Sequence, residues 1–586
     1  MIDKNSTKYT LLQQSSSANS TNSYEQQQLD QELQHELHYQ SGEVDLGDEE
    51  RQQQQQQTTP QQGLYNPERS TTYIITLTLV LGAVQLAWSL EFSEATPFLL
   101  SLGVSKQVLA LIWLAGPLSG SVGQPIVGML SDHSNANMGR RKPFVLAGCL
   151  ATTISLIYLA HSISIIGFFT GKEGDELNSA TVPFAAVGIY VLDFSIQVIQ
   201  ATSRALVVDV VPSDQQQLAN AWAARMIGGF NILGFFMGTF DLVSLTGLGD
   251  TQFKCLSLLI SVCMILMTLY CCWKIEERDP TTDLAIILER KQQANELRES
   301  GYTSTSNVGL WISLRIFVLR ICHSIGRMPR QIWTVNLGEF CAWIGYFPML
   351  FYTTSYVGEL YLHELGYSSI GDIPSDLKQG ILDESTRKGT HALLANSIVA
   401  LTVDILLPYL VEVKHYDIRR LWTISHLAFI LASFLTFFVG SSTQAVFLFA
   451  LLGIPWGCAV WIPFVMIAEE ISRIKDLKNI QISRISPDTG TSIYLSQSLI
   501  TKYNQIEYDS GILLAIHNVF VSCPQMISSL GSSLLFKMLA GNNDSIGWCF
   551  RFGGLACIGA LAFSLRIKSA YELFEEDISD MESANS

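Results

Sequence analysis

The stretch GQPIVGMLSDHSNANMGRRKPFVLAGC, residues 123–149, decides the fold of this chain. An apolar run ends at Asp132, a short polar gap follows, and three cations, Arg140, Arg141 and Lys142, stand directly before the next apolar run. An apolar run of about 20 residues is long enough to cross a lipid bilayer as a helix. The stretch therefore predicts two membrane helices joined by a short basic loop.

The composition of the whole chain agrees with this prediction. Of its 586 residues, 48% are hydrophobic and only 15% are charged, whereas roughly a quarter charged is usual for soluble domains. Most of the net charge of −16 lies in residues 1–70 and 570–586, which are typical of solvated tails. The eleven cysteines show no CxxC or Cys/His spacing, so we expect buried thiols and neither disulfides nor metal ligands.

Working outward from the opening stretch, we expect an all-α membrane protein with twelve membrane helices. The first 30 residues contain no apolar segment of the kind that a cleavable signal peptide needs. The expected spans cover residues 72–101, 106–130, 143–169, 181–210, 218–244, 254–274, 332–356, 390–412, 420–440, 443–468, 511–539 and 546–568.

A long polar gap divides these spans six and six. The expected segments are an acidic, Gln-rich tail (1–70), an N-terminal six-helix bundle (71–274), a middle loop (275–331), a C-terminal six-helix bundle (332–568) and an acidic tail (569–586). In the middle loop, residues 288–300 predict a polar helix, and residues 310–331 predict a basic amphipathic helix along the membrane surface.

The loop charges predict the orientation of the chain. Lys and Arg are concentrated in the even-numbered loops, and the positive-inside rule then places these loops and both termini in the cytosol. Two six-helix halves around a long middle loop are typical of transporters with a site between the halves. We expect a monomer in the plasma membrane, with the vacuolar membrane as the alternative.

The opening stretch also carries a motif, Gly-x-x-x-Asp followed by Gly-Arg-Arg. Its residues are Gly128, Asp132, Gly139, Arg140 and Arg141. It resembles the loop motif between spans 2 and 3 of the major facilitator superfamily, although six residues between Asp132 and Gly139 depart from the commonest spacing. The resemblance implies the fold of that superfamily.

Each residue of the motif has a physical role that we can anticipate. Gly128 is expected to permit close packing of helices, and the two arginines to pair with acids at the inner end of span 4, such as Asp209. This cluster would act as a cytosolic gate that breaks when the protein opens inward. A weaker echo, Asp417 with Arg419 and Arg420, occurs in the loop between spans 8 and 9.

Further motifs narrow the resemblance. They are AVQLAWSLEFSEATPFLLSLGV (83–104), IWLAGPLSGSVGQPIVGMLSD (112–132), VLDFSIQVIQATSRAL (191–206), RKGTHALLANSIV (387–399) and LLGIPWGCAVWIPF (451–464). They resemble the proton-coupled sucrose and α-glucoside transporters, a group similar to the glycoside-pentoside-hexuronide:cation symporters. The likeness covers about residues 72–568. The Gln-rich tail and the long loop between spans 10 and 11 favour the fungal branch.

Two charges in span 4 stand out, because a charged side chain at the bilayer centre costs roughly 2.5–3.5 kcal/mol. Asp193 and Arg204 are close to three helical turns apart, so they share a face. At 1.5 Å per residue they lie about 16 Å apart, which excludes a direct salt bridge. We expect Asp193 to be the proton-coupling carboxylate. The alternative is that Asp193 only anchors a neighbouring helix.

Span 1 contributes two carboxylates, Glu91 and Glu94, three residues apart. We expect Glu91 to face the transport cavity and to bind the proton or the sugar, with Asp193. Glu94 is as well explained by a role at the rim or between helices. Two carboxylates in one apolar span are not expected to be ionised together unless one faces water.

A neutral sugar needs hydrogen-bond donors, acceptors and apolar surfaces. The residues that we expect to bind it are Arg204, Gln197, Gln200, Asn231, Arg387, Asn396 and Trp343. Intramembrane amides often join helices instead, and Arg387 at the outer face has a gate or an anchor as alternatives. Glu339, Asp404, His426 and His517 are intramembrane residues without an assigned role.

The sequence thus predicts a proton-coupled symporter that imports sucrose or a related α-glucoside such as maltose by alternating access. Its expected partners are a disaccharide, a proton and the lipid bilayer; we expect no cofactor and no nucleic acid. No GxxxxGK[ST] phosphate loop occurs, and no nucleophile–base set indicates an enzyme. The alternatives are an uncoupled facilitator, a carrier of another sugar, and a sugar sensor or scaffold.

Overall fold

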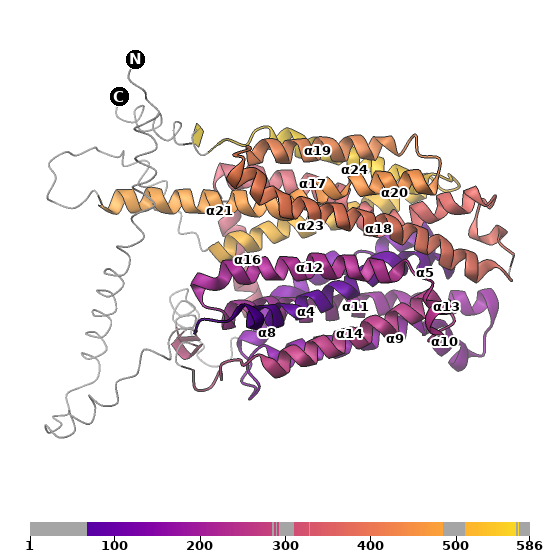
Figure 1. Cartoon of the computed structure of the whole chain (residues 1–586), viewed down its shortest axis with the longest axis horizontal. Helices are drawn as coiled ribbons and strands as arrows, with labels where there is room; N and C mark the ends of the chain where they lie inside the picture. Colours follow the sequence, from indigo (N-terminus) through magenta and orange to yellow (C-terminus); the bar gives the residue numbers. More distant parts are fainter. Residues whose placement is uncertain are drawn as a thin grey trace, which may run out of the picture. The chain divides into compact units, whose positions relative to one another are not determined.

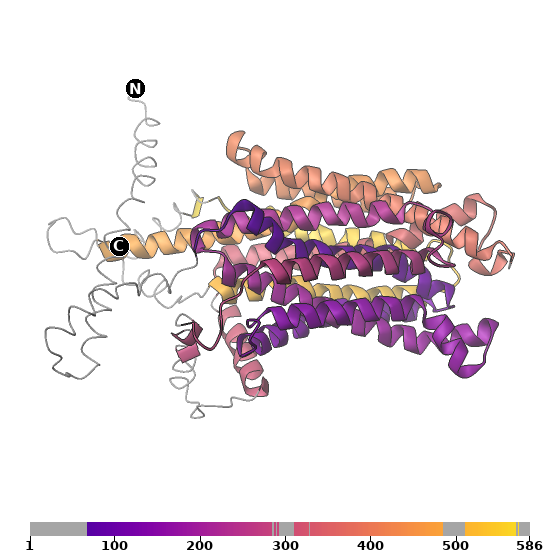
Figure 2. The ribbon, with the colours of Figure 1, turned by 60° about the horizontal axis from the view of Figure 1, so that its bottom comes forward.

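The computed structural model describes residues 67–283, 286–288, 290–291, 310–326, 328–374, 376–483, 510–569 and 572–573. All of them belong to one compact unit that starts at Asn66. The secondary structure of this described part is helical throughout, and its long helices lie side by side along one direction (Figure 1). Turning the molecule by 60° shows the same alignment (Figure 2).

The helices before the middle segment form what we call the first set. They are α4 (Thr71–Leu90), the π-helical turn η3 (Glu91–Ala95), α5 (Thr96–Ser101), α6 (Lys106–Ile112), α7 (Ala115–Leu118), the π-helical turn η4 (Ser119–Gly123), α8 (Gln124–Asp132), α9 (Lys142–Ala160), α10 (Ser162–Thr170), α11 (Gly174–Val210), α12 (Gln216–Gly238), α13 (Leu242–Thr246) and α14 (Gln252–Lys274).

The helices after it form the second set. They are α17 (Arg330–Glu364), α18 (Lys378–Pro408) with the π-helical turn η7 (Tyr409–Val413), α19 (Ile418–Leu435), α20 (Ser442–Leu451), α21 (Gly453–Ser483), α23 (Ser510–Met538) and α24 (Ser545–Ser564). Between the sets, α16 (Leu310–Ile325) packs against α8 of the first set and α23 of the second. The helix predicted at 310–331 is thus present over 310–325, and residues 330–331 belong to α17. Most of 288–300 lies outside the described residues.

Ten helical segments of the described part are long and apolar enough to cross a membrane. The helices α12 and α17 fall outside that set, although they have 23 and 35 residues and run alongside the others (Figure 1). Both are rich in polar, aromatic or small residues, which lower the mean hydropathy of a helix. Most of α17 is buried among other helices, whereas α12 buries only one side. The count of twelve spans remains a prediction.

Several helices begin or end well beyond the predicted apolar spans. α18 starts at Lys378, where we expected residue 390, and α21 continues to Ser483, where we expected residue 468. The added turns are polar, so a search for apolar length does not find them. The third span is broken at His161 into α9 and α10, where a single helix was expected.

The side chains on the outside of the bundle are apolar. Leu150, Leu266 and Phe447 expose 59%, 62% and 70% of their surface, and Trp113 and Trp422 inside are fully buried. Exposed apolar surface on this scale marks a surface that water does not cover. The chain is therefore an integral, multi-pass membrane protein.

Close packing inside the bundle depends on small residues, as is usual between membrane helices. A Cβ at Gly148 of α9 would lie 2.7 Å from the backbone nitrogen of Ile199 in α11. Gly389 of α18 packs in the same way against the backbone of Thr354 in α17. The expected packing role of Gly128 is wrong, because a Cβ there would meet no atom within 4 Å.

Candidate functional site

A pair of buried carboxyl groups comes from two helical elements of the first set. Asp193, in the middle of α11, is fully buried, and Glu91, the first residue of η3, is 1% exposed. The two groups are close enough to interact electrostatically. Neither carboxyl group has a well-formed hydrogen bond to another described residue. The sequence identified both residues but did not predict that they meet.

The helix of span 1 turns its two glutamates toward different neighbours. The π-helical turn η3 contains both residues, and such turns widen a helix by one residue and re-aim its side chains. Glu94 is 4% exposed and interacts electrostatically with Asp383 and Arg387 of α18, in the second set. This position agrees with the interhelical role that we left open for Glu94.

The amides of α11 are bonded to neighbouring helices of the first set. Gln197 accepts a hydrogen bond of 2.6 Å from Gln124 Nε2 of α8, and Gln200 accepts one of 3.0 Å from Trp88 Nε1 of α4. Gln197 has a second neighbour, because its amide nitrogen would lie 3.6 Å from a Cβ at Gly120. Gln197 and Gln200 follow Asp193 by four and seven residues, so the three side chains share one side of α11.

Two predicted sugar-binding amides join helices. Asn231 of α12 accepts a hydrogen bond from Gln85 Nε2 at 2.9 Å and donates one to Ser397 Oγ of the second set at 2.9 Å. Asn396 is 8% exposed and donates to the carbonyl oxygen of Phe449 at 2.9 Å. Asn396 thus joins α18 to α20, which is the alternative to sugar binding that we named for intramembrane amides.

The predicted basic residues lie at different depths. Arg204 is exposed and makes no hydrogen bond or ion pair with a residue that the structure describes. Asp193 likewise has no ion pair with a described residue. Arg387 lies 3.7 Å from Asp241 of the first set. Hydrogen bonds from Ser244, with the nearby Arg387 adding to them, hold the pKa of Asp241 below its usual value. Arg387 therefore lies near one end of the bundle, as expected if it acts as a gate residue.

We call this end, where Lys106 also lies, the closed end. Lys106 Nζ is 2.7 Å from Glu359 Oε1 and 3.1 Å from Ser545 Oγ, both in the second set. Nearer the middle, Thr96 Oγ1 donates to the carbonyl oxygen of Phe351 at 2.7 Å. These contacts, with those of Arg387 and Asn231, join the two sets from the closed end to the middle.

The motif of the opening stretch lies at the other end of the bundle. Arg140 donates two hydrogen bonds, of 2.9 and 2.8 Å, to the two carboxylate oxygens of Asp209. Arg141 donates to Asp209 at 2.8 Å and also pairs with Asp132. The predicted pairing of the arginines with Asp209 is confirmed. We call Asp132, Arg140, Arg141, Asp209 and Glu277 the loop cluster.

Glu277, which the sequence did not single out, completes the loop cluster. It accepts hydrogen bonds from the backbone N–H groups of Arg141 at 2.6 Å and Lys142 at 3.0 Å. Burial raises the pKa of Glu277, and these hydrogen bonds offset that effect only in part. Its carboxylate approaches Gly139 so closely that a Cβ there would clash with it, and Gly139 has φ +106°.

The middle segment adds another residue that the sequence did not reveal. Arg290 donates to the carbonyl oxygens of Asp132 at 2.8 Å and Ser134 at 3.0 Å, and to Asn135 Oδ1 at 2.8 Å. The echo in the second set has a similar arrangement, since Arg419 pairs with Asp417 at 2.7 Å and Glu572 at 2.8 Å. The contacts of the loop cluster described above all lie within the first set and the segment after it.

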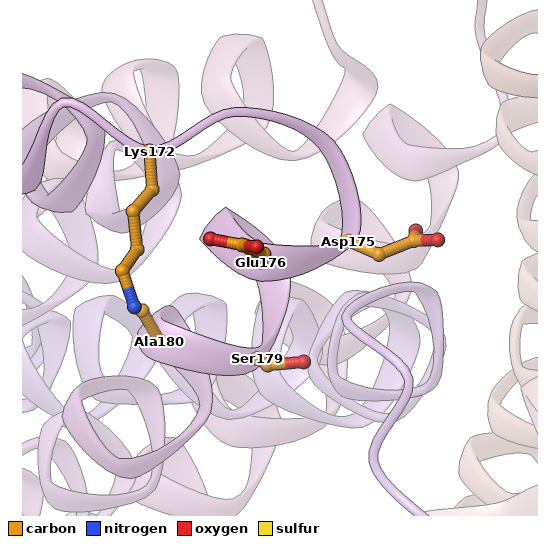
Figure 3. A pocket seen from close by; sticks show the side chains of 5 residues that line it. All are labelled: Lys172, Asp175, Glu176, Ser179 and Ala180. Carbon is orange, nitrogen blue, oxygen red and sulfur yellow. The ribbon is translucent and has the colours of Figure 1, made fainter.

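One shallow pocket lies away from these groups. Lys172, Asp175, Glu176, Ser179 and Ala180 line it, at the turn between α10 and α11 (Figure 3). The lining comes from a single loop and the first turns of one helix, so we assign it no binding role. Within the described residues, no cluster of three or more His, Cys, Asp or Glu side chains could hold a metal ion.

Two sets of membrane helices, joined from the closed end to the middle and enclosing buried carboxyl groups, define the class of this protein as a membrane transporter. The chain matches the Major Facilitator Superfamily over residues 77–474, and it belongs to that family. The predicted fold class is thereby confirmed.

Individual relatives agree with the resemblance found in the sequence. A general alpha-glucoside permease of Schizosaccharomyces pombe (strain 972 / ATCC 24843) is 29% identical over 571 residues, which cover 84% of this chain and 92% of the permease. A sucrose transport protein of Arabidopsis thaliana is 25% identical over 523 residues, 84% of this chain and 90% of that protein. The predicted resemblance to the sucrose and α-glucoside transporters, including the fungal branch, is confirmed.

Among solved structures, the partially occluded, inward-open xylose transporter of E. coli matches with a TM-score of 0.52. The match covers 85% of this chain and 98% of the xylose transporter at 13% identity. At that identity the likeness concerns the fold alone.

Proposed function

We propose that this protein is a proton-coupled symporter that imports sucrose or a related α-glucoside such as maltose by alternating access. The observation that carries the proposal is the buried pair Glu91–Asp193 in a chain related to sugar permeases. Two carboxylates that interact in this way, with no ion pair to a residue that the structure describes, do not both stay charged in a low-dielectric site. The pair is therefore suited to hold one proton and to release it when water reaches the site.

In this proposal Asp193 is the proton-coupling residue and Glu91 is its partner. The membrane potential contributes about 2.3 kcal/mol per charge per 100 mV, so carriage of a proton can drive accumulation of a neutral sugar. Gln197, Gln200 and Arg204 follow Asp193 along α11 toward the loop cluster. They offer the sugar a path of donors and acceptors, with Trp343 facing from the second set.

The remaining candidates have supporting roles in the proposal. Asn231 ties the first set to the second through Ser397, and Asn396 holds α18 to α20. Arg387 belongs to the gate at the closed end. These three residues shape the site and do not have to touch the sugar.

The proposal also has an orientation. The loop cluster and both chain termini face the cytosol, and the closed end faces outward, so the structure corresponds to an inward-facing state. The loop cluster is intact in this state, so the proposal replaces the expected gate that breaks on inward opening with a cluster that stays formed. The support for this orientation is the concentration of Lys and Arg in the loops at the loop-cluster end. We place the protein, as a monomer, in the plasma membrane, with the vacuolar membrane as the alternative.

The test is uptake of labelled sucrose and labelled maltose by cells that lack their own carriers. Uptake is measured at acidic and neutral outside pH, with and without a protonophore, for the wild type and Asp193→Asn. We expect accumulation that acid stimulates and the protonophore abolishes, and at least a tenfold loss of accumulation in Asp193→Asn. Uptake that only equilibrates, whatever the pH, would indicate a facilitator. Surface protein without uptake of either sugar would favour another sugar or a sensor.

A further inference from the structure

A buried carboxyl group in the second set has one satisfied and one unsatisfied oxygen. Glu339 of α17 is 1% exposed, and its Oε2 accepts a hydrogen bond of 2.7 Å from the indole Nε1 of Trp343. Its Oε1 is buried and has no hydrogen-bond partner among the residues that the structure describes. Because an unmet buried acceptor is costly, such a group usually serves a purpose beyond packing.

The partner of Glu339 belongs to a group of aromatic rings. Trp343 lies edge-on to Trp456 of α21, with ring centroids 5.6 Å apart, and edge-on to Tyr346 at 5.9 Å. Tyr346 is fully buried, and its hydroxyl donates to the carbonyl oxygen of Pro455 at 3.4 Å. Tyr346 therefore anchors the group, while Trp343 and Trp456 are only partly buried and keep some ring surface accessible.

The aromatic group lies in the second set, between the contact of Phe351 with the first set and the end of the bundle that carries the loop cluster. Phe351 of α17 touches Phe92 and Trp113 of the first set, with centroids 5.2 and 4.4 Å apart. Trp343 precedes Phe351 by eight residues, about 12 Å along the helix. The rings thus lie beyond the closed region, on the part of α17 that leads toward the loop cluster.

Resting on the proposed function, we propose that Trp343, Trp456 and Glu339 form a sugar subsite contributed by the second set. One indole stacks on the apolar C–H face of a sugar ring, and the other, tilted by 73° to it, contacts the edge of the same ring. Glu339 fixes the Trp343 ring by accepting the hydrogen bond of its indole N–H, and it also contacts the sugar. Its second oxygen accepts a hydrogen bond from a ring hydroxyl of the sugar.

The test combines transport kinetics with tryptophan fluorescence of the purified, full-length protein. The variants are Trp456→Leu, Glu339→Leu and Glu339→Gln, with Trp273→Leu as the control. Trp273 is 74% exposed near the end of α14 and far from the subsite in sequence. Surface protein is quantified for every variant, so that poor folding is separated from weak sugar binding.

We expect KM for the better transported sugar to rise at least fivefold in Trp456→Leu and Glu339→Leu, with the maximal rate per surface protein within twofold of the wild type. Glu339→Gln retains an oxygen acceptor for Trp343 and offers an N–H donor to the same sugar hydroxyl in place of the second oxygen, so its KM is expected within threefold of the wild type. The control is expected to match the wild type. Unchanged KM in Trp456→Leu and Glu339→Leu, with wild-type amounts at the surface, would overturn the subsite.

Fluorescence separates failure of the subsite from failure of the proposed function. In the wild type, sucrose or maltose is expected to change the emission saturably, and Trp456→Leu is expected to lose at least half of that change. If the wild type shows this change but takes up neither sugar, the subsite stands and the symporter proposal fails. If the wild type transports sugar but shows no emission change that depends on Trp456, the subsite is wrong.

Discussion

Single residues in this protein acquire their roles from partners that are distant in the chain. Glu91 meets Asp193 only because a π-helical turn in span 1 faces the middle of α11. Gly139 is required by Glu277, whose carboxylate fills the space that a side chain would take. Gly128, eleven residues earlier in the same motif, has no such neighbour. The two glycines of this motif are therefore expected to differ in their sensitivity to substitution.

Gly139→Ala is expected to disrupt the loop cluster. An alanine with a positive φ costs about 1–3 kcal/mol in backbone strain, and its Cβ would displace Glu277 from the N–H groups of Arg141 and Lys142. We expect a lower melting temperature of the purified protein and at least a fivefold slower uptake. Gly128→Ala is the matched control and is expected to behave as the wild type; equal damage by both substitutions would contradict the role of Glu277.

At the scale of elements, the loop cluster connects the ends of α8, α9 and α11 to the segment that follows α14. Bidentate pairs such as Arg140–Asp209 fix geometry more strongly than single contacts. Arg290 extends the same cluster to the middle segment. The cluster therefore holds these helix ends of the first set as one body, as a rocking-bundle mechanism requires.

Replacing Asp132 by Asn or Arg140 by Gln is expected to slow cycling more than it weakens sugar binding. Each change removes one charged partner from the cluster and none of the residues proposed to contact sugar. Uptake rate per surface protein is expected to fall at least fivefold, while the sugar concentration for half-maximal fluorescence change stays within twofold. Equal losses of binding and turnover would argue against a role in cycling.

The contact between α17 and α18 depends on Gly389. Gly389→Val would push a branched side chain into the backbone of Thr354, and overpacking of this kind costs about 1–3 kcal/mol. We expect less folded protein at the surface and a lower melting temperature. Gly380→Ala is the control in the same helix, because a Cβ there meets no atom within 4 Å. Normal stability of Gly389→Val would show that α17 and α18 pack less closely than described.

At the scale of the whole molecule, two ion pairs close one end between the sets. They are Lys106–Glu359, whose cation comes from the first set, and Arg387–Asp241, whose cation comes from the second set. Because the pKa of Asp241 is held low, its pair with Arg387 stays charged in a mildly acidic medium. These pairs must break for a sugar to enter from that side.

Charge reversal tests this gate. Lys106→Glu or Glu359→Lys alone places like charges together, so we expect the closed end to open and labelling of a cysteine introduced at Ser545 to speed up at least fivefold. The double variant Lys106→Glu/Glu359→Lys restores an opposite pair and is expected to bring labelling back to within twofold of the parent. Failure of the double variant to restore slow labelling would exclude the direct pair as the gate.

The sequence by itself determined the membrane class, most helix positions, the family resemblance and the pairing of Arg140 with Asp209. These follow from apolar length, loop charge and motif spacing, which are local properties of a chain. Only the tertiary structure decided that Glu91 meets Asp193, that Glu277 and Arg290 complete the loop cluster, and that Asn396 joins helices. The physical reason is that helix packing brings together side chains distant in sequence, and residue spacing within one span does not specify which face meets which neighbour.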